Sequence, residues 1–154
     1  MSKEEFVTAA TAAAQTSSAS SGFPPGVTVA QAALESGWGG SELARVANNY
    51  FGIKAKPGGK AIELTTNEYL AGTAVRVTAK FASYISMLEC FADRDRMIAS
   101  LAAYSEAHAA AKDPEAFIHA LARHWATDPA YAEKLLAVYR ANGFDRLDES
   151  PATT

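Results

Sequence analysis

Residues 30–54 read AQAALESGWGGSELARVANNYFGIK, and the rest of this 154-residue chain is organised around them. Just before Glu35, six of the eight residues from Val27 to Leu34 are apolar, so hydrophobic side chains lie nearly all round a helix. That pattern is typical of a buried helix rather than a surface one. The glycines on either side of Trp38 are a normal helix stop. The sequence therefore predicts a buried central helix, from about residue 27 to 36, with a carboxylate at its end.

Glu35 is the first candidate catalytic residue. Burial disfavours the charged form of a carboxyl group and so raises its pKa. A carboxyl group that keeps its proton near neutrality can donate it, as a general acid must. The alternative is a solvated glutamate, which most glutamates are, although an anion at a helix C-terminus is mildly unfavourable. The residues alone leave both interpretations open.

Further segments add a family resemblance to this local pattern. They are AQAALESGWGGSELA (30–44), NNYFGIK (48–54), TTNEY (65–69), AKFASYIS (79–86) and ATDPAYAEKL (126–135). In this order, over about residues 3–143, they resemble the glucosaminidase family of peptidoglycan hydrolases, glycoside hydrolase family 73. Flagellar rod hydrolases, autolysins and phage lysins belong to that family. One departure is Ala82, where the family often has an arginine after the phenylalanine. The resemblance implies an α+β, mostly α, lysozyme-like fold with a small β-hairpin lobe.

The resemblance also implies an activity and its two acidic residues. It implies an endo-β-N-acetylglucosaminidase that cuts between N-acetylglucosamine and N-acetylmuramic acid, with Glu35 as general acid. Glycoside hydrolysis usually needs a second group across the sugar ring, and Glu68 in TTNEY matches the family's second carboxylate. Without the resemblance, a glutamate on a hairpin is usually a solvated strand residue. Glu68 could position water as a base, or the substrate's N-acetyl group could attack as an internal nucleophile.

Sugar rings offer apolar faces for stacking and hydroxyls for hydrogen bonds, so aromatic and amide side chains are expected to bind them. Asn49, Tyr50, Phe51 and Gly52 match the family's substrate platform, although Phe51 also suits a core position. Tyr131 matches a tyrosine that the family places in the active cleft, although by sequence it could equally be a packing residue. We expect these five residues to bind the substrate.

Composition excludes several other classes of function. The net charge of −3 leaves no polybasic footprint for nucleic acid or an anionic membrane surface. No apolar run is long enough for membrane insertion. The single cysteine, Cys90, excludes an intramolecular disulfide and is predicted to be a core residue. His119 and His124 are five residues apart and share no helical face as an i, i+4 pair would. We expect no metal and no cofactor, and bacterial peptidoglycan glycan strands as the partner of a monomer.

The sequence also predicts the chain's organisation. We expect one catalytic domain over residues 1–144 and a flexible tail over 145–154. Residues 1–15 lack the basic start and hydrophobic core of a secretory signal. An enzyme that acts on the wall outside the cytoplasmic membrane would then need a non-Sec route, either holin-assisted lysis or an export apparatus.

Individual elements are predicted from local patterns. Expected are a helix over 3–18, a short helix capped by Ser41 with Leu43 and Val46 inward, a β-hairpin over 62–81 turning at 71–73, a helix over 87–104, and helices starting at the Asp-Pro pairs 113–114 and 128–129. Thr28 is the expected cap of the buried helix.

Two alternatives to a glucosaminidase remain. Muramidases and lytic transglycosylases also place a glutamate followed by serine at a helix end, but transglycosylases usually continue into a GLMQ-like run, where this chain has NNYFGIK. The other alternative is a non-catalytic wall-binding or structural module. The presence together of Glu35, Glu68 and Tyr131 argues against it.

Overall fold

The computed structural model describes residues 1–149, apart from the side chains of residues 66 and 68–70. The described elements are α1 (Lys3–Ser21), α2 (Pro25–Ser36), α3 (Glu42–Ala47), β1 (Ala61–Leu70), β2 (Thr73–Ala82), α4 (Met87–Ser100), η1 (Ala102–Tyr104), α5 (Ser105–Ala109), α6 (Pro114–Trp125), α7 (Tyr131–Ala141) and η2 (Phe144–Asp148), where η marks a 3-10 helix. The predicted class, mostly helical with one small antiparallel hairpin, is confirmed.

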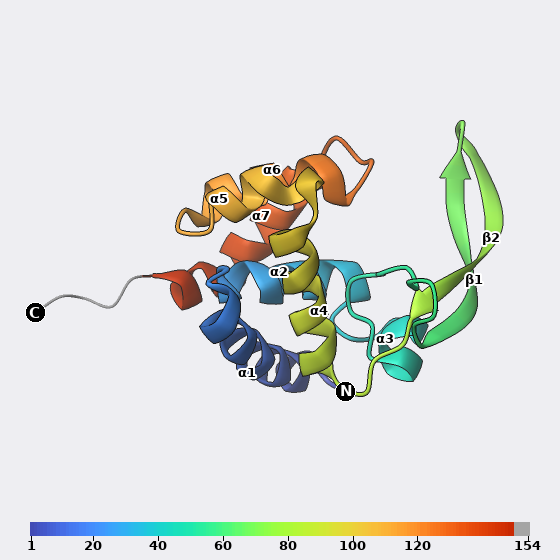
Figure 1. The fold of residues 1–154 in the computed structure, drawn as a ribbon, viewed down its shortest axis with the longest axis horizontal. Coiled ribbons are helices and arrows are strands. Elements are labelled where there is room, and N and C mark those ends of the chain that lie inside the picture. The colour runs from blue at the N-terminus through green and yellow to red at the C-terminus, as the bar shows by residue number, and fades with distance from the viewer. Residues whose placement is uncertain (150–154) are drawn as a thin grey trace, which may run out of the picture.

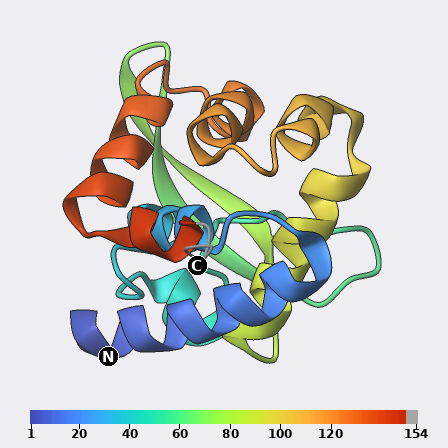
Figure 2. The same ribbon diagram turned by 90° about the vertical axis from the view of Figure 1, so that its left-hand side faces the viewer.

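Helix α2 lies at the centre of the helical lobe. It packs against α1, α7 and η2, and the views in Figures 1 and 2 show these elements around it. Nine of its 12 residues are buried, and those from Val27 to Ala33 contribute most of its share of the hydrophobic core. Burying side chains of this kind supplies the main free energy that holds the lobe together. The predicted buried helix is confirmed.

The start of α2 is held by the far end of the chain. Pro25 is the first helical residue, and the next two backbone N–H groups donate to Asp148, Gly26 to Oδ1 at 2.7 Å and Val27 to Oδ2 at 3.2 Å. A Cβ at position 26 would lie 2.1 Å from the Phe144 carbonyl oxygen, so only glycine fits there. The expected cap, Thr28, lies inside the helix, where its hydroxyl donates to the Pro24 carbonyl at 3.3 Å.

Asp148→Ala is expected to lower the free energy of unfolding by about 0.5–2 kcal/mol, the usual cost of losing a helix cap. The variant loses the acceptor for both N–H groups and for the Tyr139 hydroxyl, which donates to Oδ2 at 2.7 Å. Urea unfolding followed by circular dichroism measures the loss. Asp148→Asn, which keeps one acceptor oxygen, should lose less. Asp145→Ala, three residues away, is the matched control, and an equal loss there would contradict the cap.

The hairpin stands away from the helices at one end of the molecule (Figure 1). Strands β1 and β2 pair in register from Ala61 with Ala82 to Leu70 with Thr73. The two turn residues, Ala71 at φ 52° and Gly72 at φ 81°, have the left-handed conformation that a type I′ turn requires. Only the base of β2 is buried, at Phe81 and Ala82. The predicted hairpin is confirmed.

Several further details differ from the sequence prediction. The first helix, expected over residues 3–18, continues to Ser21. The helix expected over 87–104 ends at Ser100, because Leu101 is extended before the 3-10 turn η1. The Asp128-Pro129 pair forms a turn, in which the Asp128 carboxylate accepts from the Ala130 N–H at 2.8 Å, and α7 begins only at Tyr131. Val46, expected to face inward, is 52% exposed, because α3 is only six residues long and buries Ala44 and Ala47 instead.

Residues 145–148, which belong to the expected tail, are part of a 3-10 helix. Residues 144–148 form η2, and the Asp148 hydrogen bonds described above fix it to α2. Residues 150–154 of that predicted tail lie outside the described part of the chain. Within residues 1–149, none of the helices has the length and apolar character needed to cross a membrane.

Candidate active site

Glu35 lies in the last turn of α2, where a tight turn redirects the chain. Gly37 and Trp38 both have positive φ, 56° and 59°. The Ser36 hydroxyl donates to the Ala32 carbonyl at 2.6 Å and accepts from the Gly39 N–H at 2.8 Å. The helix end is therefore fixed by its own serine, and the half-buried Glu35 side chain is held at the wall of a cleft.

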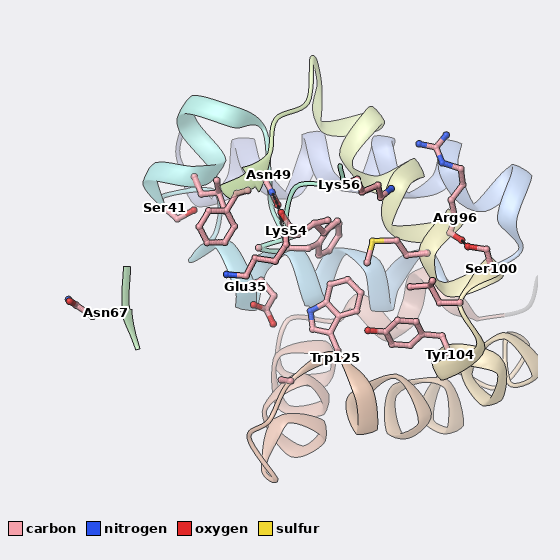
Figure 3. A pocket seen from close by; sticks show the side chains of 18 residues that line it. Glu35, Ser41, Asn49, Lys54, Lys56, Asn67, Arg96, Ser100, Tyr104 and Trp125 are labelled. Atoms are coloured by element: carbon pink, nitrogen blue, oxygen red, sulfur yellow. Dashed lines mark hydrogen bonds between the residues drawn. The ribbon is translucent and has the colours of Figure 1, made fainter. Parts of the chain in front are cut away.

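That cleft has a volume of about 1160 Å³ and lies between the helical lobe and the base of the hairpin. In Figure 3 side chains from several elements surround Glu35 and Trp125, while Asn67 on the hairpin stands apart from them. Glu35 comes from α2, Asn67 and Phe81 come from the hairpin, and Tyr104 and Trp125 come from η1 and α6. The site is thus assembled from residues that lie up to 91 positions apart in the sequence.

Burial raises the pKa of Glu35 above its ordinary value of 4.5, and a hydrogen bond from Tyr131 opposes this with a smaller effect. The Tyr131 hydroxyl lies behind Glu35, and its oxygen also accepts from Gln31 Nε2 at 3.3 Å. The Tyr131 side chain is buried and is not part of the cleft wall. The structure therefore places Tyr131 against the acid rather than in the space where a substrate would lie.

Asn49 holds the loop that follows α3. Its Nδ2 donates to the carbonyls of Ile53 and Ala82, both at 2.9 Å, and its Oδ1 accepts from the N–H groups of Phe51 and Ile53 at 3.3 and 3.1 Å. Both amide hydrogens and both acceptor positions of Asn49 are thus used inside the protein. This geometry gives the side chain a part in shaping the cleft.

The other residues of this loop face two ways. Phe51 and Gly52 line the cleft together with Asn49. The Tyr50 ring instead faces the core, 6.1 Å from the Phe6 ring and 6.2 Å from the Phe91 ring between centroids. Of the five residues expected to bind substrate, the structure brings three to the cleft wall and places Tyr50 and Tyr131 behind it.

Glu68, the expected second carboxylate, is described only by its backbone. It lies on β1 and pairs with Val75 of β2. Its side chain lies outside the described residues. The neighbouring residue Asn67 is part of the cleft lining. The role of Glu68 stays a prediction.

One wall of the cleft carries positive charge. Lys56 Nζ lies 2.6 Å from Asp93 Oδ1, and Arg96 Nη2 lies 3.1 Å from the same oxygen. Tyr84 donates to the other oxygen at 2.6 Å. Burial raises the pKa of Asp93, but the hydrogen bonds from Lys56, Tyr84 and Arg96 outweigh it, so the net pKa is lowered. Asp93 thus stays ionised and fixes two cations that are themselves well exposed. We call Lys56 and Arg96 the cationic wall.

No sequence motif singles out the cationic wall or the residues behind Glu35. Lys56 and Arg96 are 40 positions apart, and no local pattern joins them. Arg94, by contrast, could have been identified from the sequence pattern. It lies on the apolar stripe of α4, four residues after Cys90 and four before Ile98, and it is fully buried with them. A charged residue in an apolar stripe indicates a buried polar network.

Cys90 is a core residue, as predicted. Burial raises the pKa of its thiol to about 12, so it is protonated near neutrality and is no nucleophile. In the part of the chain that the structure describes, no three His, Cys, Asp or Glu side chains gather in a metal-binding group.

Comparison with known proteins adds the family. The glucosaminidase model, described as mannosyl-glycoprotein endo-beta-N-acetylglucosaminidase, matches residues 11–144. The exo-glucosaminidase LytG of Bacillus subtilis is 35% identical over 130 residues, which cover 81% of this chain and 46% of LytG. The peptidoglycan hydrolase FlgJ of Salmonella typhimurium is 36% identical over 141 residues, covering 88% of this chain and 45% of FlgJ. The chain spans less than half the length of these two curated relatives.

A solved structure agrees with these matches. The catalytic domain of the autolysin Auto from Listeria monocytogenes has a TM-score of 0.81 to this chain at 29% identity, covering 94% of this chain and 86% of the other. This likeness confirms the predicted lysozyme-like fold with its hairpin lobe. The family match over residues 11–144 shows that this chain belongs to the glucosaminidase family, glycoside hydrolase family 73.

Proposed function

We propose that this chain hydrolyses the glycan strands of bacterial peptidoglycan as an endo-β-N-acetylglucosaminidase, cleaving the GlcNAc-β-1,4-MurNAc bond. The observation that carries the proposal is a half-buried carboxyl group with a raised pKa, Glu35, in the wall of a large open cleft. At about 1160 Å³ the cleft exceeds the pockets of roughly 300–1,000 Å³ that hold drug-sized ligands. It therefore suits several sugars of a polymer, and family membership supports the chemistry.

In the proposed reaction Glu35 donates its proton to the glycosidic oxygen as the bond to the anomeric carbon breaks. The raised pKa keeps this proton available, and the hydrogen bond from Tyr131 stabilises the carboxylate that forms. Trp125, half-buried beside Glu35 in the cleft, offers an indole face for a sugar ring. Asn49 holds the loop that places Phe51 and Gly52 along the same cleft.

The second group in the proposal is Glu68, which would either activate water or orient the substrate's N-acetyl group for internal attack. The anomer formed first separates these two roles. Attack by a base-activated water inverts the anomeric carbon, whereas a two-step reaction through the N-acetyl group retains it. Proton NMR of freshly released products reads the anomer directly.

The cationic wall supports peptidoglycan over a neutral polymer of N-acetylglucosamine. The whole chain carries a net charge of −3, yet the described cleft lining contains Lys54, Lys56 and Arg96 against the single acid Glu35. The stem peptides of peptidoglycan carry carboxylates, whereas chitin-type chains carry none. A cationic wall beside the sugar path is complementary to the former.

Replacing Lys56 and Arg96 together by glutamine is expected to raise KM for peptidoglycan by about two- to thirtyfold, the effect of two exposed ion pairs of about 0.2–1 kcal/mol each. Glutamine keeps a hydrogen-bond donor for the buried Asp93 while removing the charge. Turnover of glycan strands stripped of their peptides should not change. The control is Lys112→Gln with Arg123→Gln, two exposed cations outside the cleft. An equal rise in KM on stripped strands would refute the charge assignment.

The decisive experiment is digestion of purified peptidoglycan, followed by borohydride reduction and mass spectrometry of the released fragments. N-acetylglucosaminitol ends on multi-sugar fragments would establish an endo-acting glucosaminidase. Early release of single sugars would indicate exo action instead. Muramitol ends would show a muramidase, and anhydro-muramyl ends a lytic transglycosylase. If the protein sediments with walls of several types but releases no fragments from them, it is a non-catalytic binding module.

A further inference from the structure

Arg94 lies at the centre of the core, where a charge is costly. Its side chain has no exposed surface, and its guanidinium carbon lies 5.5 Å from the Phe51 ring centroid and 5.7 Å from that of Phe117. One of its nitrogens, Nη2, has no hydrogen-bond partner among the described residues. A buried charge with an unsatisfied donor destabilises a fold unless its remaining contacts compensate. Those contacts lead towards the proposed acid.

The contacts form a chain of hydrogen bonds with a fixed direction. Arg94 Nε donates to Gln31 Oε1 at 3.0 Å. A guanidinium has donors only, so the amide oxygen must face Arg94 and the amide nitrogen must face away. That nitrogen, Nε2, donates to the Tyr131 hydroxyl oxygen at 3.3 Å. The hydroxyl oxygen is then an acceptor towards Gln31, and its single proton is left for the neighbouring Glu35, whose pKa the Tyr131 hydroxyl lowers.

The other end of the chain is anchored in α1 and α4. Arg94 Nη1 donates to the Thr28 hydroxyl and to Asp95 Oδ1, both at 2.8 Å. Asp95 Oδ2 in turn accepts from the hydroxyls of Ser17 at 2.6 Å and Ser21 at 2.8 Å. The guanidinium therefore cannot rotate to release the Gln31 oxygen without breaking several buried hydrogen bonds.

We propose that Arg94 and Gln31 are positioning residues: Arg94 locks the orientation of the Gln31 amide, so that the Tyr131 hydroxyl can donate only to Glu35. This rests on the proposed role of Glu35 as the acid. A flipped amide would present its oxygen to Tyr131 and compete for that proton. With the amide locked, one Glu35 oxygen accepts from Tyr131, and the acidic proton is carried by the other oxygen, the one available to the cleft.

Gln31→Glu is the critical variant, because it exchanges the donor for an acceptor with almost no change of shape. The new carboxylate can accept from both Arg94 and Tyr131, so it draws the hydroxyl proton away from Glu35. A general acid works only while protonated, and both the lost hydrogen bond and the added negative charge raise its pKa. The alkaline limb of the kcat profile should therefore move up by about one pH unit, the low end of the roughly 1–3 units by which a neighbouring opposite charge shifts a pKa the other way. KM should not change, since Gln31 is not part of the cleft wall.

Three further variants separate the direction of the hydrogen bond from the effects of charge and of packing. Gln31→Met removes donor and acceptor alike, so Tyr131 still donates to Glu35 and the alkaline limb should stay at its wild-type position. Tyr131→Phe alone removes the hydroxyl that stabilises the Glu35 carboxylate, so it should move the alkaline limb of the kcat profile to higher pH. In the Tyr131→Phe background, Gln31→Glu adds only its charge, so its shift should be smaller than in the wild type. If Gln31 serves only packing, Gln31→Glu acts through its charge alone, and its shift should be equal in the wild-type and Tyr131→Phe backgrounds.

Other ionisable groups also face Glu35 and must be held constant. They are Tyr131 from α7, the Arg94 charge behind Gln31 from α4, and the cleft residues Lys54, Lys56 and Arg96. None is changed by the substitutions at position 31. The difference between the glutamate and methionine variants therefore reports on position 31 alone.

One measurement needs no variant. Nuclear Overhauser effects from the Gln31 side-chain amide protons to the Tyr131 ring would establish the inferred orientation, and effects to Arg94 instead would overturn it. The inference is also overturned if Gln31→Glu leaves the alkaline limb in place, or if Gln31→Met moves it as far. A wild-type protein that releases no peptidoglycan fragments would overturn the proposed function instead, while the amide orientation could still be measured.

Discussion

Replacing Glu35 by glutamine is expected to lower kcat on peptidoglycan by about 10²–10⁴-fold, the contribution of a positioned general acid. Glutamine has nearly the same shape and can still accept from Tyr131, so the cleft should keep its geometry and KM should change little. Fragment release by the purified variant, measured as new reducing ends, gives the ratio. Glu42→Gln is the control, because Glu42 is exposed on α3 and is not part of the cleft lining. A variant at position 35 with more than a tenth of wild-type kcat would refute the assignment.

The same substitution is expected to stabilise the protein at alkaline pH. Burial raises the pKa of Glu35 above 4.5 in the folded state, so the folded protein binds this proton more tightly than the unfolded chain. The stability gained from that preference is complete below the unfolded pKa and is lost as the pH rises through the folded pKa. Glutamine never ionises. The Tm of the Glu35→Gln variant should exceed the wild-type Tm in mildly alkaline buffer, and the difference between the two Tm values should shrink in acid. A constant difference would contradict this linkage.

Asp95→Ala is expected to cost about 3–5 kcal/mol of unfolding free energy, the range for removing one partner of a buried ion pair. The Asp95 side chain is 6% exposed and lies 2.8 Å from Arg94. Alanine would leave the Arg94 charge without its anion and the hydroxyls of Ser17 and Ser21 without their acceptor. This loss of unfolding free energy should be far larger than the loss expected when Asp148, the cap of α2, is replaced by alanine.

Urea unfolding of wild type, Asp95→Ala and Asp95→Asn measures this loss. Asparagine keeps an acceptor oxygen for Arg94 and the serines, so its loss should lie between the other two. Exposed salt bridges contribute up to about 1 kcal/mol. If Asp95→Ala lowers the free energy of unfolding by less than this, the buried Asp95–Arg94 pair contributes no more than an exposed pair does.

The fold could largely be predicted because its decisive signals are local. An apolar run predicted α2, and a turn between alternating segments predicted the hairpin. Of the two Asp-Pro pairs, the one at 113 caps α6 as expected, since Asp113 accepts from the Ala116 N–H at 3.2 Å. The other forms a turn before α7, because Asp128 bonds Ala130 and Lys134 instead. Local sequence does not distinguish these two uses of the same pair.

The site was less predictable because its partners are distant in the sequence. Glu35 could be singled out by the character of its own helix. Gln31, Arg94 and Tyr131 come together only once α2, α4 and α7 pack. The family resemblance implied a cleft position for Tyr131, which the sequence alone could not distinguish from a packing position. The same holds for Lys56 and Arg96, which meet through Asp93.

The cap at the start of α2 has a consequence for protein engineering. The segment that matches the family model ends at residue 144, yet the carboxylate that caps α2 is at position 148. Glu35 lies at the opposite end of that helix. A fusion protein trimmed to the matched segment would discard this carboxylate and loosen the helix that carries the proposed acid. Fusion junctions to wall-targeting modules should therefore be placed after Asp148.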